Sequence, residues 1–426
     1  FINDEEMAPF MSTDLFGTLS QYLQRATRRG EYADRFGNIG EEITKARDEA
    51  VKQGATDIQL KAFDESVKAM EGTLGAEIDP RLKGVYSGLM TYQNLRLLPL
   101  QLFASLIDPL GIMVRGGTLG EATAAFGKGL RDLATLGKAS KDDAYEIAKT
   151  IGSIDAANAH GLMSEMASSG YMPKLQRGIN DKFFRWNGME LWNQRMRAQA
   201  TVAAVNFIDR HMKRPTEHSA RFMKELGLKK GDKLNAKNPD YVRAVNKWVD
   251  EAILRPNSAQ RPVYMSDPNW MLISHLKQYT YLFQKVIVAR VYHEIQHGNY
   301  TPAMALAAYV PGMMMADMAK MLLTPGSGDD NARAGWTFMD WFGHGMQRAG
   351  LFGPSQYGLE MGTDMKRGGI GIESAAGPTI QQLIQFLQGS MQGRMGLQLE
   401  KAIPGYNIIK PAGSGGGGQS TAPATH

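Results

Sequence analysis

The feature that most constrains the fold is the spacing of apolar residues, which recur every three or four positions along most of the chain. Leu15, Leu19 and Leu23 show this pattern near the N-terminus. Such spacing places apolar side chains on one face of an α-helix. Few stretches alternate apolar and polar residues, and the nearest candidate, residues 284–292, lies within a helical pattern. We therefore predict an all-α fold, an irregular bundle of many helices broken by glycine and proline.

Capping residues help to locate the helix starts. Ser12-Thr13-Asp14 precedes the first helix, and Asp79 followed by Pro80 is typical of a helix N-terminus. The first eighty residues then hold a helix from about Leu15, a second between Gly40 and Gly54, and a third over 56–72. Further helices are expected over 80–98, 100–107, 118–136, 140–150, 153–168, 175–212, 216–226, 238–254, 267–297, 302–322, 333–349, 354–366 and 376–400.

Changes in composition predict four regions. Residues 1–78 form a charged helical region, and residues 79–323 form the main helical body. Residues 324–411 form a glycine-rich region of short helices, because Pro325 to Asn331 has the composition of a loop. Residues 412–426 consist of Gly, Ser, Thr, Ala and Pro with little else, which predicts a flexible, disordered tail.

Composition excludes several classes of function. The chain of 426 residues has no cysteine, so disulfides, thiolate metal sites and cysteine nucleophiles are excluded. The formal net charge of +5 is small for this length, which argues against nucleic-acid binding through bulk charge. The 26 methionines suit either a core or a surface that repacks against partners. Because Phe1 opens sequence of internal character, we expect the chain to be a piece of a longer protein.

Two segments approach the character of a membrane span. Residues 95–114 and 301–323 are apolar, but each contains charged residues and proline. A central Asp or Lys costs about 2.5–3.5 kcal/mol on insertion, which offsets most of the gain of about 5 kcal/mol from a dozen apolar residues. These segments are either buried core helices or surfaces that meet a membrane or subunit after assembly. The residues predicted for such contact are Leu97, Leu98, Leu102, Phe103, Met313, Met314 and Met315.

The sharpest chemical motif is His293-Glu294-Ile295-Gln296-His297. Two histidines four residues apart on a helix can bind zinc while the glutamate activates a water, with Asp317 as a possible third ligand. Against this, Gly298-Asn299 is typical of a helix end directly after the second histidine. Zinc peptidases also place a sheet edge beside the cleft, and no sheet is predicted. We therefore favour a structural role for this motif and expect no metal, cofactor or catalytic residue.

A second candidate segment, residues 182–214, interleaves aromatic residues with arginines. Aromatic and cationic side chains can stack on bases and neutralise phosphates. The same pattern also describes an amphipathic helix that packs by its aromatic face. On the first interpretation, the residues that contact DNA are Arg185, Arg195, Arg197 and Arg210.

Five stretches resemble the C-terminal region of large bacteriophage internal virion proteins, also called large polyvalent proteins. They are Gly88 to Leu100, Phe184 to Glu190, Gln260 to Pro268, Leu276 to Pro302, and Arg348 to Pro354 together with Ala376-Gly377-Pro378. They span roughly residues 80–410 in a consistent order.

This resemblance implies a structural protein without enzymatic activity. Such proteins are packaged in the virion interior (capsid) and pass into the host envelope and periplasm when the genome is ejected. They are thought to form an oligomeric conduit for DNA translocation. The implied partners are copies of the chain, other phage ejection or portal proteins, double-stranded DNA and the host inner membrane. Two alternatives stay open at this point: a static internal core or scaffold protein near the portal, and a zinc metallopeptidase using His293, Glu294 and His297.

Overall fold

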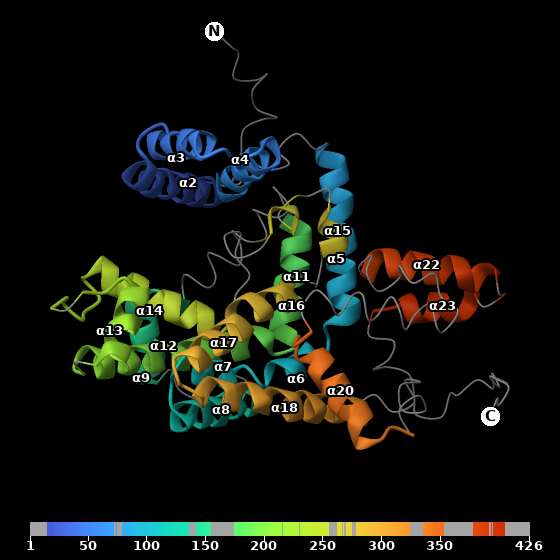
Figure 1. Cartoon of the computed structure of the whole chain (residues 1–426). Coiled ribbons are helices and arrows are strands. Elements are labelled where there is room, and N and C mark those ends of the chain that lie inside the picture. The colour runs from blue at the N-terminus through green and yellow to red at the C-terminus, as the bar shows by residue number, and fades with distance from the viewer. Residues whose placement is uncertain are drawn as a thin grey trace, which may run out of the picture. The chain divides into compact units, whose positions relative to one another are not determined.

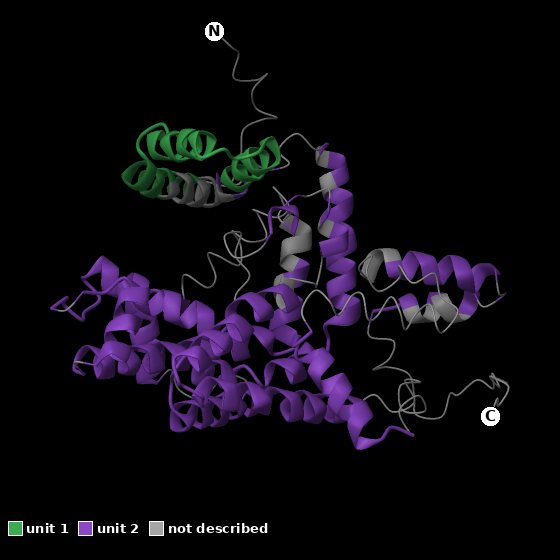
Figure 2. Ribbon diagram, in the orientation of Figure 1, with its two compact units in different colours: residues 1–68 green, residues 69–426 purple. Residues whose placement is uncertain are grey.

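A computed structural model describes residues 15–71, 74, 79–135, 142–154, 174–214, 216–229, 231–254, 262–265, 267, 270–274, 278–323, 335–352, 378–391, 393 and 395–404. Over these residues the secondary structure is helical and contains no strand, so the predicted all-α class is confirmed (Figure 1). The chain forms two compact units, residues 1–68 and residues 69–426 (Figure 2). The finer division into regions stays a prediction. The tail predicted over 412–426, the helix expected over 354–366, and residues 155–168 of the helix expected over 153–168 lie outside the described residues.

The first unit is built from α2 (Leu15–Phe36), α3 (Glu41–Lys52) and the beginning of α4 (Asp57–Glu71). Gly40 precedes α3 in the left-handed conformation, with φ of 81°, which glycine adopts without strain. The Arg47 Nε donates to Asp64 Oδ1 over 2.8 Å and joins α3 to α4. Because α3 buries none of its residues, packing contributes little to its stability.

The helices of the second unit begin with α5 (Pro80–Leu97), α6 (Gln101–Ser105), α7 (Pro109–Val114), α8 (Leu119–Ala134) and α9 (Asp143–Ile151). They continue with α11 (Lys174–Trp186), α12 (Met189–Met212), α13 (Glu217–Leu226), α14 (Pro239–Ala252) and α15 (Met271–Ser274). The C-terminal half contains α16 (Gln278–Leu282), η4 (Phe283–Val288), α17 (Ala289–Gln296), α18 (Thr301–Leu323), α20 (Phe338–Arg348), α22 (Pro378–Met391) and α23 (Met395–Ala402).

The main core surrounds α12. This helix packs against α8, α9, α13 and α14, and it buries residues on every side rather than along one stripe. Trp192, Phe207 and Trp248 are its largest fully buried apolar side chains. The Trp192 indole Nε1 donates to the Ser105 carbonyl over 3.0 Å, which ties the core to the end of α6. A helix that is buried all round is the central element of its bundle.

A second core lies where α18 crosses α7 and the continuous helix formed by η4 and α17. Phe283, Ile287, Tyr309 and Met313 form its centre. Backbones come unusually close beside it, because a Cβ placed on Gly111 would lie 1.9 Å from the Ala252 carbonyl oxygen. Only glycine permits α7 to approach the end of α14 in this way.

Most predicted helix boundaries agree with the structure, and the differences have physical causes. Pro99 and Pro109 interrupt the helices near them as expected, but Pro109 also begins α7, a helix that the sequence did not predict. The predicted helix 175–212 divides at Gly188, which adopts a φ of 79°. The helix predicted over 302–322 is confirmed as α18, which runs unbroken past Pro311. Proline there removes a single backbone hydrogen bond, and packing against α7, α17 and α20 retains the helix.

Among the described helices, none is both long enough and apolar enough to cross a membrane alone. Gly84–Leu97 and Gln101–Val114 meet the requirement of length and composition only as a pair, and this pair is bent by 78°.

Candidate functional site

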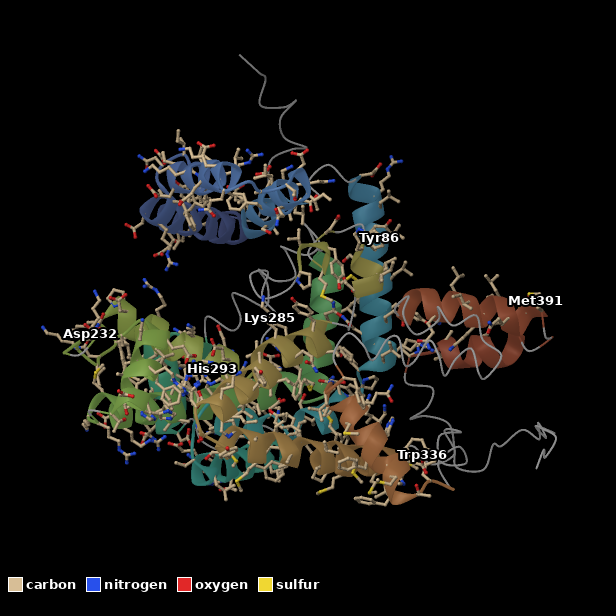
Figure 3. The ribbon with its side chains drawn as sticks, viewed as in Figure 1. Tyr86, Asp232, Lys285, His293, Trp336 and Met391 are labelled. Carbon is tan, nitrogen blue, oxygen red and sulfur yellow. The ribbon has the colours of Figure 1, made fainter. Side chains whose placement is uncertain are left out.

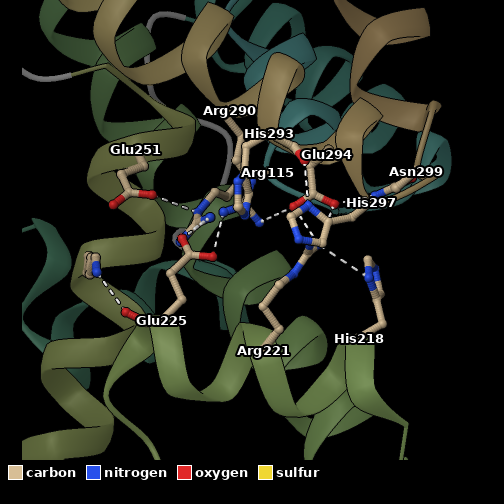
Figure 4. A network of polar contacts seen from close by, with 11 residues as sticks. Arg115, His218, Arg221, Glu225, Glu251, Arg290, His293, Glu294, His297 and Asn299 are labelled. Atoms are coloured by element: carbon tan, nitrogen blue, oxygen red, sulfur yellow. Dashed lines mark hydrogen bonds and ion pairs between the residues drawn. The ribbon is translucent and has the colours of Figure 1, made fainter.

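The glutamate of the His-Glu-x-x-His motif is buried in a network of arginines. Glu294 on α17 is 1% exposed and faces α13 (Figure 4). Arg221 Nη2 donates to both of its carboxylate oxygens over 2.9 Å, and Asn299 Nδ2 donates to Oε2 over 2.8 Å. Arg290, one turn earlier on α17, lies 3.1 Å away through Nη2. These donors occupy the carboxylate that would have to activate a water in a zinc peptidase.

The two histidines of the motif lie on the exposed side of the same helix. His297 Nδ1 donates to the His293 carbonyl oxygen over 2.8 Å, so this ring nitrogen carries the proton. The helix ends at Gln296, and Gly298 turns the chain with a φ of 73°, as the sequence predicted. Asp317 lies elsewhere, 2.7 Å from His344 Nε2 and 3.3 Å from Arg348 Nη2. No group of three or more His, Asp or Glu side chains in the described part of the chain is arranged to hold a metal ion.

The network continues from Arg290 to a fully buried arginine. Arg290 Nη1 lies 2.5 Å from Glu225 Oε2, and the other oxygen of Glu225 lies 2.7 Å from Arg115 Nη1. Arg115 is 3% exposed and also pairs with Glu251 over 2.9 Å. Burial by itself raises the pKa of Glu225, but Arg115 and Arg290 outweigh that effect and hold this pKa at about 2. Three arginines and three glutamates from α13, α14, α17 and the end of α7 therefore neutralise one another.

The positive charge of the network also acts on its histidines. Burial lowers the pKa of His293, and the neighbouring His297, Arg221 and Arg290 lower it further. Burial and Arg221 lower the pKa of His218 in the same way. Arg221 Nη2 lies 3.2 Å from His218 Nδ1, which must accept this hydrogen bond. Both histidines are thus held in the neutral form near physiological pH.

A cavity of about 390 Å³ opens beside the network. It is lined by Arg221, Glu225, Glu251, Lys285, Val286, Arg290 and His293. Lys285 and Val286 belong to η4, a stretch of π-helix that continues into α17. Such π-helical turns are rare and occur frequently at functional sites.

Comparisons with protein-family models, with curated proteins and with solved structures find no match.

The structure separates the four arginines predicted to contact DNA into two classes. Arg195 and Arg197 are buried: Arg195 lies 2.5 Å from Asp132 and 2.8 Å from Asp142, and Arg197 lies 2.7 Å from Asp250. The interpretation of these two as DNA contacts is wrong, because their guanidinium groups are enclosed by carboxylates inside the bundle. Arg185 is exposed and Arg210 is partly exposed, with Glu190 and Glu121 as their respective partners. For these two the prediction stands untested.

The residues predicted for subunit or membrane contact lie partly in the cores of the second unit and partly at its surface. Met313 belongs to the second core, so its assignment to a contact surface is wrong. Leu102 packs against the main core, and Met314 lies within reach of Gly345 on α20. Leu97, the last residue of α5, is exposed, whereas Leu98, which caps the helix, is partly buried. Phe103 and Met315 line an apolar cavity of about 370 Å³ between α6, α7, α8 and α18.

Met315 is part of a longer exposed stripe on α18. Met304, Met315, Met318 and Leu322 are exposed at helical spacing, with exposed fractions of 72, 69, 43 and 82%. Ala307 and Pro311 occupy exposed positions between them, so the stripe contains no charged residue. We call these six residues the α18 stripe.

Sequence reasoning missed Arg115, Arg221, Glu225 and Glu251. Arg221 lies 73 residues before its partner Glu294, and Glu225 lies 65 residues before its partner Arg290. None of the four residues forms a recognisable motif. Single charged residues of this kind resemble ordinary surface residues. The sequence offered one indirect signal, the helix end expected at Gly298-Asn299, which argues against a zinc site around Glu294.

Proposed function

We propose that this chain is a structural, non-catalytic segment of a phage internal virion protein, which assembles into an oligomeric conduit for DNA across the host envelope. The observation that carries the proposal is the α18 stripe beside an apolar cavity. It runs from Met304 to Leu322, which is about 27 Å along a helix axis. Soluble monomers seldom expose a contiguous apolar surface of this kind, whereas assembly surfaces do.

The occupant that we propose for this surface is a second copy of the chain. The same chain exposes another apolar stripe along one face of α22, where Leu383, Leu387 and Met391 recur every four residues. Met395 and Leu399 on α23, and Ile403 just after it, are exposed as well. The helix α22 contains no charged residue, which matches the uncharged α18 stripe. Contact between two different patches is head to tail, and repetition of such a contact produces a ring or a tube.

The buried network supports the absence of catalysis in this proposal. Glu294 is held by Arg221, Arg290 and Asn299, so its role is to join α17 to α13. Because these donors occupy both of its carboxylate oxygens, Glu294 is not free to bind and activate a water.

The test is the oligomeric state of the purified chain, measured by mass photometry and by electron microscopy across protein concentration. We expect rings or tubes, and we expect Leu322→Glu to shift the population to monomers by placing a charge in an apolar contact. Ile58→Glu is the matched control, because Ile58 is equally exposed (82%) but lies in the first unit. A monomer under all conditions, with or without lipid vesicles, would refute the proposal.

A second experiment separates the conduit from the static scaffold. Immunodetection of the protein after infection should find it in the host envelope fraction. Retention in the spent particle would instead identify a scaffold.

A further inference from the structure

The cavity beside the arginine–glutamate network has a chemistry that its structural role does not require. The three arginines and three glutamates of the network neutralise one another. Lys285 adds a charge that no ion pair in the described residues balances, and its Nζ lies 6.0 Å from the Tyr281 ring centroid. Figure 3 shows Lys285 and His293 on the η4–α17 helix that forms one wall. The cavity therefore carries a net positive charge.

The arginines of this cavity also retain unused donors. Arg290 has a side chain that is 9% exposed, and its Nε has no hydrogen-bond partner among the described residues. The Nε and Nη1 atoms of Arg221 are buried and likewise lack an acceptor in the described structure. A buried donor without an acceptor costs about 1–3 kcal/mol. Arg221 and Arg290 both line the cavity, so a ligand oxygen that enters between their guanidinium groups would supply an acceptor for these donors.

We propose that this cavity binds a small ligand through a phosphate group. Donors from Arg221, Lys285 and Arg290 come from two different helices, and a terminal phosphate offers three acceptor oxygens where a carboxylate offers two. Arginine is the side chain best suited to such an oxyanion, because its planar group is always charged and presents donors in a fixed arrangement. The volume of about 390 Å³ exceeds what a phosphate alone fills and falls within the range of small-molecule sites.

The acidic residues of the cavity do not oppose this assignment. Glu225 and Glu251 both pair with Arg115, which is 3% exposed. These ion pairs compensate the negative charge of the two glutamates. His293 at the rim can donate or accept a hydrogen bond in its neutral form. The inference is independent of the proposed conduit, since it concerns α13, α14 and α17 and uses neither apolar stripe.

The test measures binding of three probes to the full chain by calorimetry and by ³¹P NMR at constant ionic strength: inorganic phosphate, pyrophosphate and adenosine monophosphate. We expect saturable binding with millimolar or lower Kd, and adenosine without phosphate should not bind. Tighter binding of the monophosphate than of inorganic phosphate identifies a phosphate ester as the ligand class; the reverse order identifies free phosphate.

Variants assign the binding to this cavity. Lys285→Ala should weaken it by about tenfold or more, the usual effect of losing one charged hydrogen bond. Lys224→Ala is the matched control, because Lys224 is exposed on α13 and lies outside the cavity lining. Arg221→Lys keeps the charge that pairs with Glu294 but removes two donors, so it should weaken binding while the protein stays folded by circular dichroism. Absence of saturable binding, or equal Kd values for Lys285→Ala and Lys224→Ala, would overturn the proposal.

Discussion

Replacement of Glu294 by Gln tests whether the His-Glu-x-x-His motif is structural. The side chain keeps its shape and loses its charge, while Arg221 and Arg290 remain in place. Removing one partner from a buried ion pair costs about 3–5 kcal/mol, because the remaining charge is left uncompensated. Here Arg221 loses a bidentate partner at 2.9 Å and Arg290 loses one at 3.1 Å. Since a protein's total stability is about 5–15 kcal/mol, the variant should be strongly destabilised.

Tryptophan fluorescence during urea unfolding measures this effect selectively. All six tryptophans lie in the second unit, and Trp192 and Trp248 are fully buried there. Their emission therefore reports the unfolding of the unit that contains Glu294. The free energy of unfolding follows from the midpoint and the slope of the transition.

Two companion variants make the result interpretable. His293→Ala changes an exposed side chain and should alter stability by less than about 0.5 kcal/mol. Asp240→Asn breaks the exposed pair with Arg243 and should cost no more than about 1 kcal/mol. Equal small effects of Glu294→Gln and Asp240→Asn would refute the structural account. Stoichiometric zinc in the purified protein that disappears in His293→Ala would refute it as well.

Three further predictions concern the interior of the second unit. The pKa of Glu225 is lowered from 4.5 to about 2, so its contribution to stability is present above pH 4.5 and is lost as the pH falls toward 2. Urea unfolding midpoints measured across this range should therefore depend less on pH in Glu225→Gln than in the unchanged protein. Gly111→Ala should destabilise by about 1–3 kcal/mol or more in urea unfolding because its Cβ meets a backbone carbonyl, whereas Gly127→Ala, with open space around it, should stabilise by up to about 1 kcal/mol. Arg195→Gln should lower the free energy of unfolding by about 3–5 kcal/mol, because Asp132 stays buried without its partner. The same change at the exposed Arg185 should lower it by no more than about 1 kcal/mol. Equal values for the two variants would contradict the assignment of Arg195 to the core.

Local signals in the sequence predicted helix positions well. Asp79 caps α5 through the Arg81 amide over 2.7 Å, with Pro80 in the first turn as expected. Glycines with positive φ mark the ends of other helices, including Gly298 after the histidine motif. These features depend on neighbours within four residues, so the sequence contains the information directly.

Burial of individual residues was predicted less well, because it depends on distant segments. Arg195 and Arg185 look alike in the sequence, yet Arg195 meets Asp132, which lies 63 residues away, while Arg185 remains exposed. Met313 and Met315 are two residues apart on α18, and they point to the core and to solvent respectively. Helical spacing predicts that they differ in direction, but it does not predict which of the two faces the core.

The amino-acid sequence by itself determined that the chain is helical, where most helices begin and end, and that cysteine chemistry is impossible. Only the tertiary structure decided that Glu294 pairs with Arg221, 73 residues earlier, and that Arg195 is buried beside Asp132. The physical reason is the range of the interactions: capping and periodicity act within one or two helical turns, whereas pairing and packing depend on which helices meet. The charged cavity and the apolar stripe also depend on the tertiary structure, since segments distant in the sequence set the burial and the partners of their residues.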